Sequence, residues 1–305
     1  MYVILMNNYH VFYHYPCNDG ELSRVVWNYF EPNSCFYKWI HQNDHEDDIN
    51  MINNLPEGSN VVFLDVTPNI INRLSNKNKY IIIDHHKNAI ISLIDDKPNL
   101  PNYNILLYVE KGFPEKNTLS GCKLTWLYFT TNKEDYPSIV FYIGNKDVWD
   151  FSNPNTESYC LGINDYINNI NNINDETERL KFMDKLIEEP ADELFIDIGK
   201  NLIKDYRLQA ETIFKNYNTN IDNNMNIIDI ECSNNMLSKY LIEYAQEHFD
   251  DADILRILHS KNDNKLSYSL RSLKEHVKVD GMARFYGGNG HEKAAGYTIH
   301  YANNE

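Results

Sequence analysis

The stretch Tyr80-Ile81-Ile82-Ile83-Asp84-His85-His86 decides the fold, because an apolar run ends there abruptly in a carboxylate and two imidazoles. A short run rich in β-branched residues predicts a strand buried on both faces, as in a parallel sheet covered by helices. The polar triplet then lies at the carboxyl end of the strand, where open α/β sheets bind ligands. Aspartate with histidine is a mixed oxygen and nitrogen ligand set for a divalent metal. The alternative is a strand that runs into a polar turn.

The rest of the N-terminal half predicts strands that alternate with helices. Strands are expected in five short apolar runs, at residues 11–14, 35–40, 61–64, 80–83 and 105–109. Apolar residues at helical spacing follow the first strand at 21–30, Pro68 marks the start of another helix, and Ser120 is the expected N-cap of a third. This alternation predicts an α/β fold with a doubly wound, mostly parallel sheet.

Polar side chains at the strand ends are expected to meet at one edge of this sheet. They are His14, Asp19, Asp65, Asp84, His85 and, from a neighbouring loop, Asp147. One polar residue at a strand end is ordinary, but acids and imidazoles at four such places indicate a site for divalent metal. Residues 16–20 are expected to form the turn that carries Asp19.

Length and charge limit the possible functions. A chain of 305 residues is long enough for two domains, each with its own core. It has 28 Lys and Arg residues against 44 Asp and Glu residues, a net charge of −16. Binding of a long nucleic acid depends on neutralising phosphates with cations, so this charge argues against such a partner. A small anionic substrate bound at a local site is compatible with it.

The cysteines and the apolar runs bear on location. The five cysteines are odd in number and include no Cys-x-x-Cys pair, so neither a disulfide framework nor a structural zinc site is indicated. Residues 2–6 lack a basic flank and are too short for the apolar core of a signal peptide. No apolar run approaches the length of a membrane span. We therefore expect a soluble, cytoplasmic protein without a membrane partner.

The C-terminal part predicts a helical connector and a second, smaller α/β domain. Residues 194–214 have a long helical pattern, and residues 216–226 are polar and turn-rich. We expect three parts, an N-terminal domain at 1–190, a connector at 191–225 and a second domain at 226–305.

A glycine-rich segment, Tyr286 to Tyr297, has three glycines within four residues, followed by His291. Such a loop lets backbone N–H groups approach an anion, although a plain structural turn is the alternative. Residues 265–293 contain six Lys or Arg residues against three Asp or Glu residues. Cationic groups therefore lie where a phosphate-binding loop needs them.

Six motifs occur in order along nearly the whole chain. They are His14-x-x-Cys17-x-Asp19-Gly20, Leu64-Asp65, Asp84-His85-His86, Asp147-Val148-Trp149, Ser269-Leu270-Arg271-Ser272 and Gly287-Gly288-Asn289-Gly290-His291-x-x-Ala294-Ala295-Gly296. Together they resemble the DHH phosphoesterase superfamily with its C-terminal DHH-associated domain. This group contains oligoribonucleases (nanoRNases), cyclic-dinucleotide phosphodiesterases, RecJ-type exonucleases and, with a different second domain, family II pyrophosphatases.

The resemblance implies a centre of two divalent metal ions, usually Mn²⁺, with Mg²⁺ or Co²⁺ as alternatives. Asp65 would bridge the ions, and His14 would help to hold the first. Asp19, His85 and Asp147 would hold the second. Imidazoles among carboxylates favour Mn²⁺ or a later metal over Mg²⁺.

The same resemblance assigns catalytic and substrate-binding residues. Asp84 would orient an imidazole, and His86 would face the scissile phosphate. Arg271 would grip a phosphate bidentately. Four residues of the glycine-rich segment would hold a terminal phosphate or the leaving nucleotide, namely Gly288, Asn289, Gly290 and His291.

Two positions leave alternatives open. Many members of the family open with His-x-x-x-Asp-x-Asp, whereas here the segment is one residue shorter and Cys17 stands where the first acid would align. A thiolate could replace the acid as a softer ligand, the ion could bind loosely, or Cys17 is a small packed side chain. Trp149 is expected in the core or in a lid, with base stacking as the alternative.

The leading hypothesis is a metal-dependent phosphodiesterase that hydrolyses short oligonucleotides or (cyclic) dinucleotides to nucleoside monophosphates, with water activated by two metal ions. The nearest alternative is a phosphomonoesterase that acts on 3′,5′-bisphosphonucleotides. A metal- or nucleotide-binding module without turnover is a third hypothesis, motivated by Cys17. The full set of N-terminal ligands disfavours an editing or tRNA-contacting role. A homodimer is compatible with the sequence.

Overall fold

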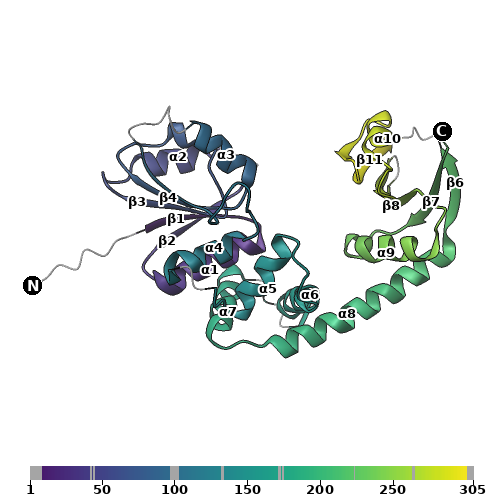
Figure 1. Cartoon of the computed structure of the whole chain (residues 1–305), viewed down its shortest axis with the longest axis horizontal. Helices are drawn as coiled ribbons and strands as arrows, with labels where there is room; N and C mark the ends of the chain where they lie inside the picture. Colours follow the sequence, from purple (N-terminus) through teal and green to yellow (C-terminus); the bar gives the residue numbers. More distant parts are fainter. Residues whose placement is uncertain are drawn as a thin grey trace, which may run out of the picture. The chain divides into compact units, whose positions relative to one another are not determined.

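The structure is a computed structural model that describes residues 9–300, apart from residues 42, 44, 97–102, 132–133, 171–172, 174, 223 and 263–264. The chain divides into two compact units, residues 1–200 and 201–305 (Figure 1). The N-terminal stretch at residues 2–6 lies outside the described residues. No described helix is long and apolar enough to cross a membrane.

A five-stranded sheet forms the centre of the first unit. Its strands are β1 (Tyr9–His14), β2 (Cys35–Trp39), β3 (Asn60–Leu64), β4 (Lys79–Ile83) and β5 (Asn104–Tyr108). They lie in the order β2-β1-β3-β4-β5, and every neighbouring pair is parallel. The predicted α/β fold with a parallel, doubly wound sheet is therefore confirmed. In this strand order the direction of winding reverses between β1 and β3, where such sheets form a ligand crevice at the carboxyl ends of the strands.

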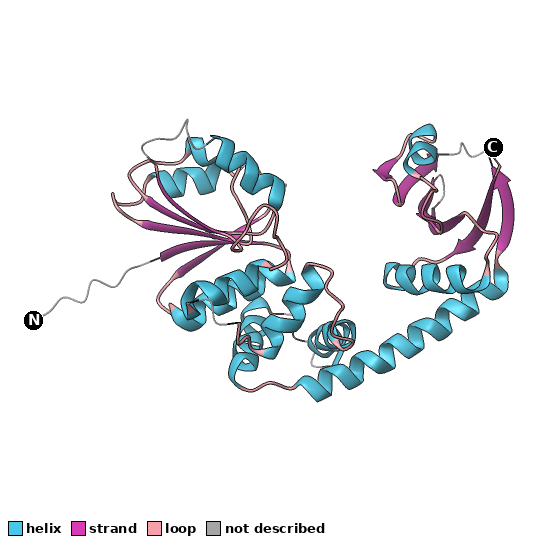
Figure 2. Cartoon of the chain, in the orientation of Figure 1, coloured by secondary structure: helices cyan, strands magenta, loops and turns pink. Residues whose placement is uncertain are grey.

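Helices cover both faces of this sheet (Figure 2). One face carries α2 (Glu46–Asn53) and α3 (Lys87–Asp96), and the other carries α1 (Asn18–Phe30) and α4 (Gly121–Thr130). Because successive strand residues point to opposite faces, Phe12 packs in the core under α2 while its neighbours Val11 and Tyr13 pack in the core under α1. All three side chains are at most 1% exposed, so both faces of β1 are buried.

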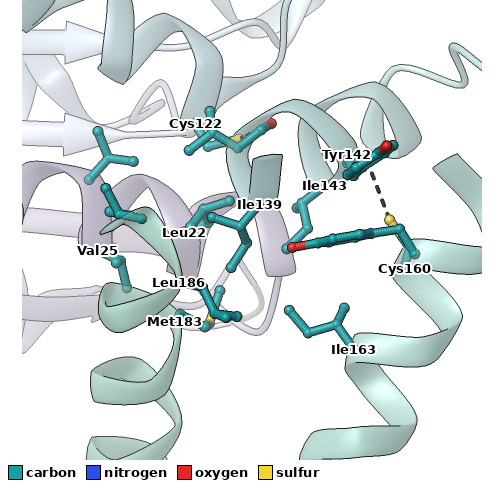
Figure 3. Close-up of a cluster of buried hydrophobic side chains, with 14 of the residues drawn as sticks. Leu22, Val25, Cys122, Ile139, Tyr142, Ile143, Cys160, Ile163, Met183 and Leu186 are labelled. Atoms are coloured by element: carbon teal, nitrogen blue, oxygen red, sulfur yellow. Dashed lines mark hydrogen bonds between the residues drawn. The ribbon is translucent and has the colours of Figure 1, made fainter. Parts of the chain in front are cut away.

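A helical layer extends the first unit beyond α1 and α4. It contains α5 (Ser138–Asp147), α6 (Thr156–Asp165), a π-helix at Tyr166–Ile170, α7 (Glu176–Glu188) and the start of α8 (Asp192–Ile213). Figure 3 shows its core, in which Leu22 of α1 meets Ile139 and Ile143 of α5 and Met183 of α7. Burying such a side chain contributes roughly 1.5–3 kcal/mol, so this core fixes α5 and α6 beside α1.

The second unit is a six-stranded mixed sheet with helices on it. Its strands are β6 (Asn218–Asp222), β7 (Met225–Glu231), β8 (Ile254–Asn262), β9 (Lys265–Ser272), β10 (Asn289–His291) and β11 (Ala294–His300), in the order β10-β11-β9-β8-β7-β6. Only β7 and β8 pair in parallel among these described strands. One core contains the end of α8 and α9 (Ser238–His248), and another contains α10 (Asp280–Phe285). Short 3-10 turns lie at Phe214–Asn216 and Asn235–Leu237.

Three local predictions are wrong, for identifiable reasons. Helix α1 begins at Asn18, so Asp19 and Gly20 lie in its first turn and not in the predicted turn at residues 16–20. A Cβ at Gly20 would lie 2.2 Å from the carbonyl oxygen of His14, so this glycine allows the helix to pack closely against the strand end. Pro68 is followed only by a 3-10 turn, Ile71–Arg73, because the polar, turn-favouring residues 75–78 intervene before β4. Asp147 ends α5 instead of lying in a loop.

Two further predictions concern the second unit. The glycine-rich segment leads into the hairpin of β10 and β11, in which Gly290 pairs with Ala295. Helix α8 runs from the first unit into the second, and β6 belongs to the second sheet. The division into a catalytic domain, a connector and a substrate-binding domain stays a prediction.

Candidate metal centre

Asp65 lies at the centre of the carboxyl edge of the first sheet. Strand β3 ends at Leu64, and Asp65 then adopts a left-handed conformation with φ +56°, which Asp tolerates better than most residues. Its N–H still donates to the carbonyl oxygen of Ile83 on β4 at 2.8 Å. This hydrogen bond holds the end of β3 against β4, and the Asp65 residue is only 1% exposed.

Two groups of potential ligands share Asp65. Its Oδ2 lies 3.2 Å from Nδ1 of His14, and its Oδ1 lies 3.2 Å from Nε2 of His85. One group is His14, Asp65 and His86, and the other is Asp19, Asp65 and His85; within each group the potential ligand atoms lie within 4.8 Å of one another. Residues from three strand ends and one helix thus converge on a single carboxylate.

Asp19 is held by the N-terminus of α4. Its Oδ2 accepts the N–H of Gly121 at 2.6 Å, and its Oδ1 accepts the N–H of Cys122 at 3.0 Å. Ser120 occupies the predicted N-cap position, but its hydroxyl makes no capping hydrogen bond. The carboxylate from α1 takes over that role, because the first N–H groups of a helix lack partners within the helix and favour negative charge.

His85 and Asp147 complete this side of the edge. His85 Nε2 lies 3.2 Å from Oδ2 of Asp147 and 3.8 Å from Oδ2 of Asp19. Helix α5 carries Asp147 to this place, and a buried contact between Lys123 of α4 and Asn145 of α5 fixes the two helices together. The imidazole of His85 therefore faces three carboxylates.

Asp84 supports the two histidines that follow it. This fully buried carboxylate accepts the backbone N–H of His85 at 2.7 Å and the hydroxyl of Thr67 at 2.6 Å. It also lies 2.7 Å from Nδ1 of His86. A carboxylate can only accept, so Nδ1 of His86 carries a hydrogen, and Nε2 is the nitrogen that can gain or lose a second proton. Asp84 thus orients the imidazole of His86, as the resemblance implies.

Crowding of buried carboxylates shifts the pKa values at this edge. Burial, followed by the charges of Asp65 and Asp147, raises the pKa of Asp19 well above its usual range. Burial tends to lower the pKa of His85, but Asp65, Asp19 and Asp147 outweigh it and raise that pKa to about 9. Burial also opposes ionisation of Asp65, but His14 and His85 lower its pKa below the usual value. Asp65 thus keeps its negative charge.

The donor set fits a divalent cation. Oδ1 of Asp65 is buried and accepts no hydrogen bond from any described residue, and its 3.2 Å contact with Nε2 of His85 is an ion pair. A buried carboxylate oxygen without a donor is costly unless a cation or water meets it. The imidazoles of His14 and His85 and the carboxylates of Asp19 and Asp147 lie around Asp65, and this mixed set of ligands suits Mn²⁺ or a later metal.

We expect the metal-free protein to lose thermal stability as the pH rises from 6.5 to about 9. A group whose pKa is higher in the folded state than in the unfolded state stabilises the fold. This contribution is complete at pH values below the unfolded-state pKa and is lost as the pH rises through the folded-state pKa. For His85 that window runs from 6.5 to about 9, and the raised pKa of Asp19 acts in the same direction. Unfolding temperatures measured in chelator across this window check it, with His85→Ala as the variant whose profile should be flatter. An unfolding temperature that rises between pH 6.5 and about 9 would contradict this prediction.

Three residues near the edge differ from expectation or were missed. Cys17 joins neither ligand group of the described residues, and burial, followed by the charge of Asp65, raises the pKa of its thiol, which disfavours the thiolate that a metal ligand requires. Trp149 is 81% exposed, so its expected place in the core is wrong. His41 was missed; its ring lies 4.7 Å from that of His14, and its position just after β2 was the signal that could have identified it.

The predicted phosphate-binding residues lie in the second unit. Arg271 is on β9, partly buried, and no described carboxylate forms an ion pair with it. The N–H groups of Gly288 and Gly290 already donate to the carbonyl oxygen of Ala283 and to Oδ1 of Asn289, both at 2.8 Å. An anion here would therefore depend mainly on Arg271 and on His291, which is exposed.

Comparisons with known proteins establish a shared fold. No family model matches the chain. The uncharacterized protein R106 of Acanthamoeba polyphaga mimivirus is 24% identical over 309 residues, covering 95% of this chain and 67% of that protein. A pGpG-specific phosphodiesterase from Vibrio cholerae has a TM-score of 0.54 at 12% identity, covering 95% of this chain and 93% of its own. An exopolyphosphatase-related protein from Bacteroides fragilis has a TM-score of 0.42 at 14% identity, covering 95% and 86%. The chain has the fold of the phosphodiesterase.

Proposed function

We propose that this protein is a metal-dependent phosphodiesterase of the DHH type that hydrolyses short oligonucleotides or (cyclic) dinucleotides to nucleoside monophosphates. The observation that carries the proposal is Asp65, a buried carboxylate shared by two groups of potential metal ligands at the β1/β3 crevice. Two-metal hydrolases of phosphate esters need such a shared carboxylate to keep two cations close together. The fold that the chain shares with a pGpG-specific phosphodiesterase supports this choice of substrate class.

The first ion would be held by His14 and Asp65, and the second by Asp65, Asp19, His85 and Asp147. We propose Mn²⁺, with Mg²⁺ or Co²⁺ as alternatives. When bound, such ions neutralise charge that develops on a phosphoryl group and make a water more acidic. His86 lies close to the first ion's ligands, and we assign it to the phosphate and not to the ion.

The chain's own residues supply orientation and a proton. Asp84 holds His86 through Nδ1, and this hydrogen bond raises the pKa of His86 although burial opposes the shift. The side chain of His86 is 41% exposed, so part of its ring is accessible from solvent. A phosphate oxygen or a leaving alkoxide at this part could receive a proton from the imidazolium.

Charge favours short substrates. The net charge of −16 opposes long polyanions. Within residues 265–293, Lys274, Lys278 and Arg284 already form ion pairs with acidic side chains. Arg271 is half-buried without a carboxylate partner among the described residues, which suits a bidentate grip on one phosphate. Asn289 and His291 would add polar contacts to a terminal phosphate or the leaving nucleotide.

We expect the purified protein with Mn²⁺ to release nucleoside monophosphates from di- to pentanucleotides. The His85→Ala variant removes an imidazole that contacts three carboxylates, so its kcat/KM should fall by about a hundredfold or more. His300→Ala, at an exposed position at the end of β11, is the matched control and should retain activity. Chromatography of the products measures both. No monophosphate from any substrate, with wild type and His85→Ala equally inactive, would refute the proposal.

A binding module without turnover is the second candidate, because Cys17 replaces an acid and joins neither ligand group among the described residues. Tight binding of Mn²⁺ or a dinucleotide by calorimetry, without product formation, would select it. Adding a 3′,5′-bisphosphonucleotide to the substrate panel tests the phosphomonoesterase alternative in the same experiment.

A further inference from the structure

We propose that the cavity between α1, α5 and α6 binds the nucleobase of the substrate, with the indole of Trp149 stacked on the base at its mouth. The proposal rests on the proposed function, because the cavity borders the candidate metal centre. It assigns a specificity site in the first unit, separate from the predicted phosphate-binding residues of the second.

Trp149 is placed for contact with a ligand. It is 81% exposed and adopts a left-handed conformation with φ +57°, which a bulky side chain rarely takes. Two hydrogen bonds fix this turn: the N–H of Trp149 donates to the carbonyl oxygen of Lys146 at 3.1 Å, and the N–H of Asp150 donates to that of Asn145 at 2.8 Å. Strained backbone and an exposed large aromatic side chain together suggest a binding role.

The cavity beside Trp149 suits a flat, partly apolar ligand. It has a volume of about 260 Å³. Its apolar wall comprises Ile143 of α5 with Cys160 and Ile163 of α6, which lie close together in Figure 3. Ligand pockets commonly range from roughly 300 to 1,000 Å³, so this cavity lies just below that range and suits one nucleobase better than a longer strand.

The polar lining of the cavity connects it to the metal centre. Asp19 and Asp147 line it, and both also face His85. Lys146 supplies a cation beside them. A nucleotide with its base against the apolar wall would therefore place its phosphate toward the metal-binding edge. This is the arrangement that cleavage next to a recognised nucleotide requires.

A smaller neighbouring cavity offers groups that can read the edge of a base. It has a volume of about 60 Å³ and shares Asn18, Ile143, Ile163 and Asn164 with the first. At its lining, Arg179 donates from one terminal nitrogen to Glu21 at 2.5 Å, while its buried Nε–H has no acceptor among the described residues. A base with a hydrogen-bond acceptor on its edge would satisfy this donor, and the amides of Asn18 and Asn164 can donate or accept.

Direct binding measured by calorimetry with chelator present tests the subsite without turnover. We expect GMP to bind the wild type more tightly than ribose 5-phosphate does. The Trp149→Gly variant should weaken GMP binding by about 5- to 150-fold, in the range measured for loss of one base–aromatic stack. Trp149→Phe should retain most of the affinity, and the affinity for ribose 5-phosphate should not change. Glycine populates positive φ readily, so Trp149→Gly keeps the turn and the fold.

Kinetics with an abasic dinucleotide provide the second test. Trp149→Gly should raise KM for a dinucleotide several-fold or more but leave KM for its abasic analogue within about twofold, because the latter has no base to stack. Equal GMP affinity in wild type and variant would overturn the proposal, as would a parallel loss of GMP and ribose 5-phosphate binding. If the protein hydrolyses no substrate but binds GMP in a way that depends on Trp149, the proposed function is refuted and the proposed base-binding subsite is still supported.

Discussion

An Asp65→Asn substitution is expected to lower kcat/KM for dinucleotide hydrolysis by about a thousandfold or more, the largest effect of any single change in this protein. Among the described residues Asp65 alone belongs to both ligand groups, so the amide weakens both cation sites at once. Metal ions contribute several kcal/mol of charge stabilisation, and each 1.4 kcal/mol or so is about tenfold in rate. Elemental analysis should show the metal content falling together with the rate.

The change from Asp65 to Asn preserves shape, so the variant should fold. Its unfolding temperature and circular dichroism spectrum verify this. Asp95→Asn, near the exposed end of α3, is the matched control and should keep both full metal content and full activity. A variant of Asp65 that binds as much Mn²⁺ as the wild type and retains activity within about tenfold would show that Asp65 is not a shared ligand.

The ends of the sheet strands could be predicted from sequence because hydrophobic period and strand length are local properties. The apolar run at Tyr80–Ile83 must be buried on both faces, and the first polar residue after it must therefore lie at the edge. The same argument applied to β1 and β3 correctly placed His14 and Asp65 beside each other, since parallel strands end on the same side. The strand alternation, and with it the fold class, followed from the same pattern.

Other features of the edge depend on packing that no local pattern contains. Glycine and proline near Asp19 indicated a turn, whereas Gly20 lies in a helix because α1 must approach His14 closely. Asp147 is predicted in a loop but ends helix α5, and in that helix a Cβ at Gly144 would lie 2.6 Å from Oγ of Ser120. Both glycines serve helix contacts, which only the three-dimensional arrangement reveals.

Gly121→Ala is expected to damage the protein although alanine is the better helix former. A Cβ at Gly121 would lie 2.7 Å from the Cβ of Asp65 and 2.9 Å from Oδ2 of Asp19. The first turn of α4 would have to move away, which breaks the hydrogen bond that Asp19 accepts from Gly121. Overpacking costs about 1–3 kcal/mol, and a displacement of about 1 Å in an active site can cost about a hundredfold in rate. Thermal unfolding and dinucleotide kinetics measure the two effects.

Gly281→Ala separates this steric argument from helix propensity. Gly281 lies in α10, and no atom comes within 4 Å of the position that its Cβ would take. Alanine should therefore leave activity unchanged and stabilise by up to about 1 kcal/mol, the ordinary gain over glycine inside a helix. The two substitutions are chemically identical, so opposite effects on stability can arise only from what surrounds each position. If Gly121→Ala behaved like Gly281→Ala, the backbone of α4 could not lie against the two carboxylates, and the candidate metal centre would lose its fixed wall.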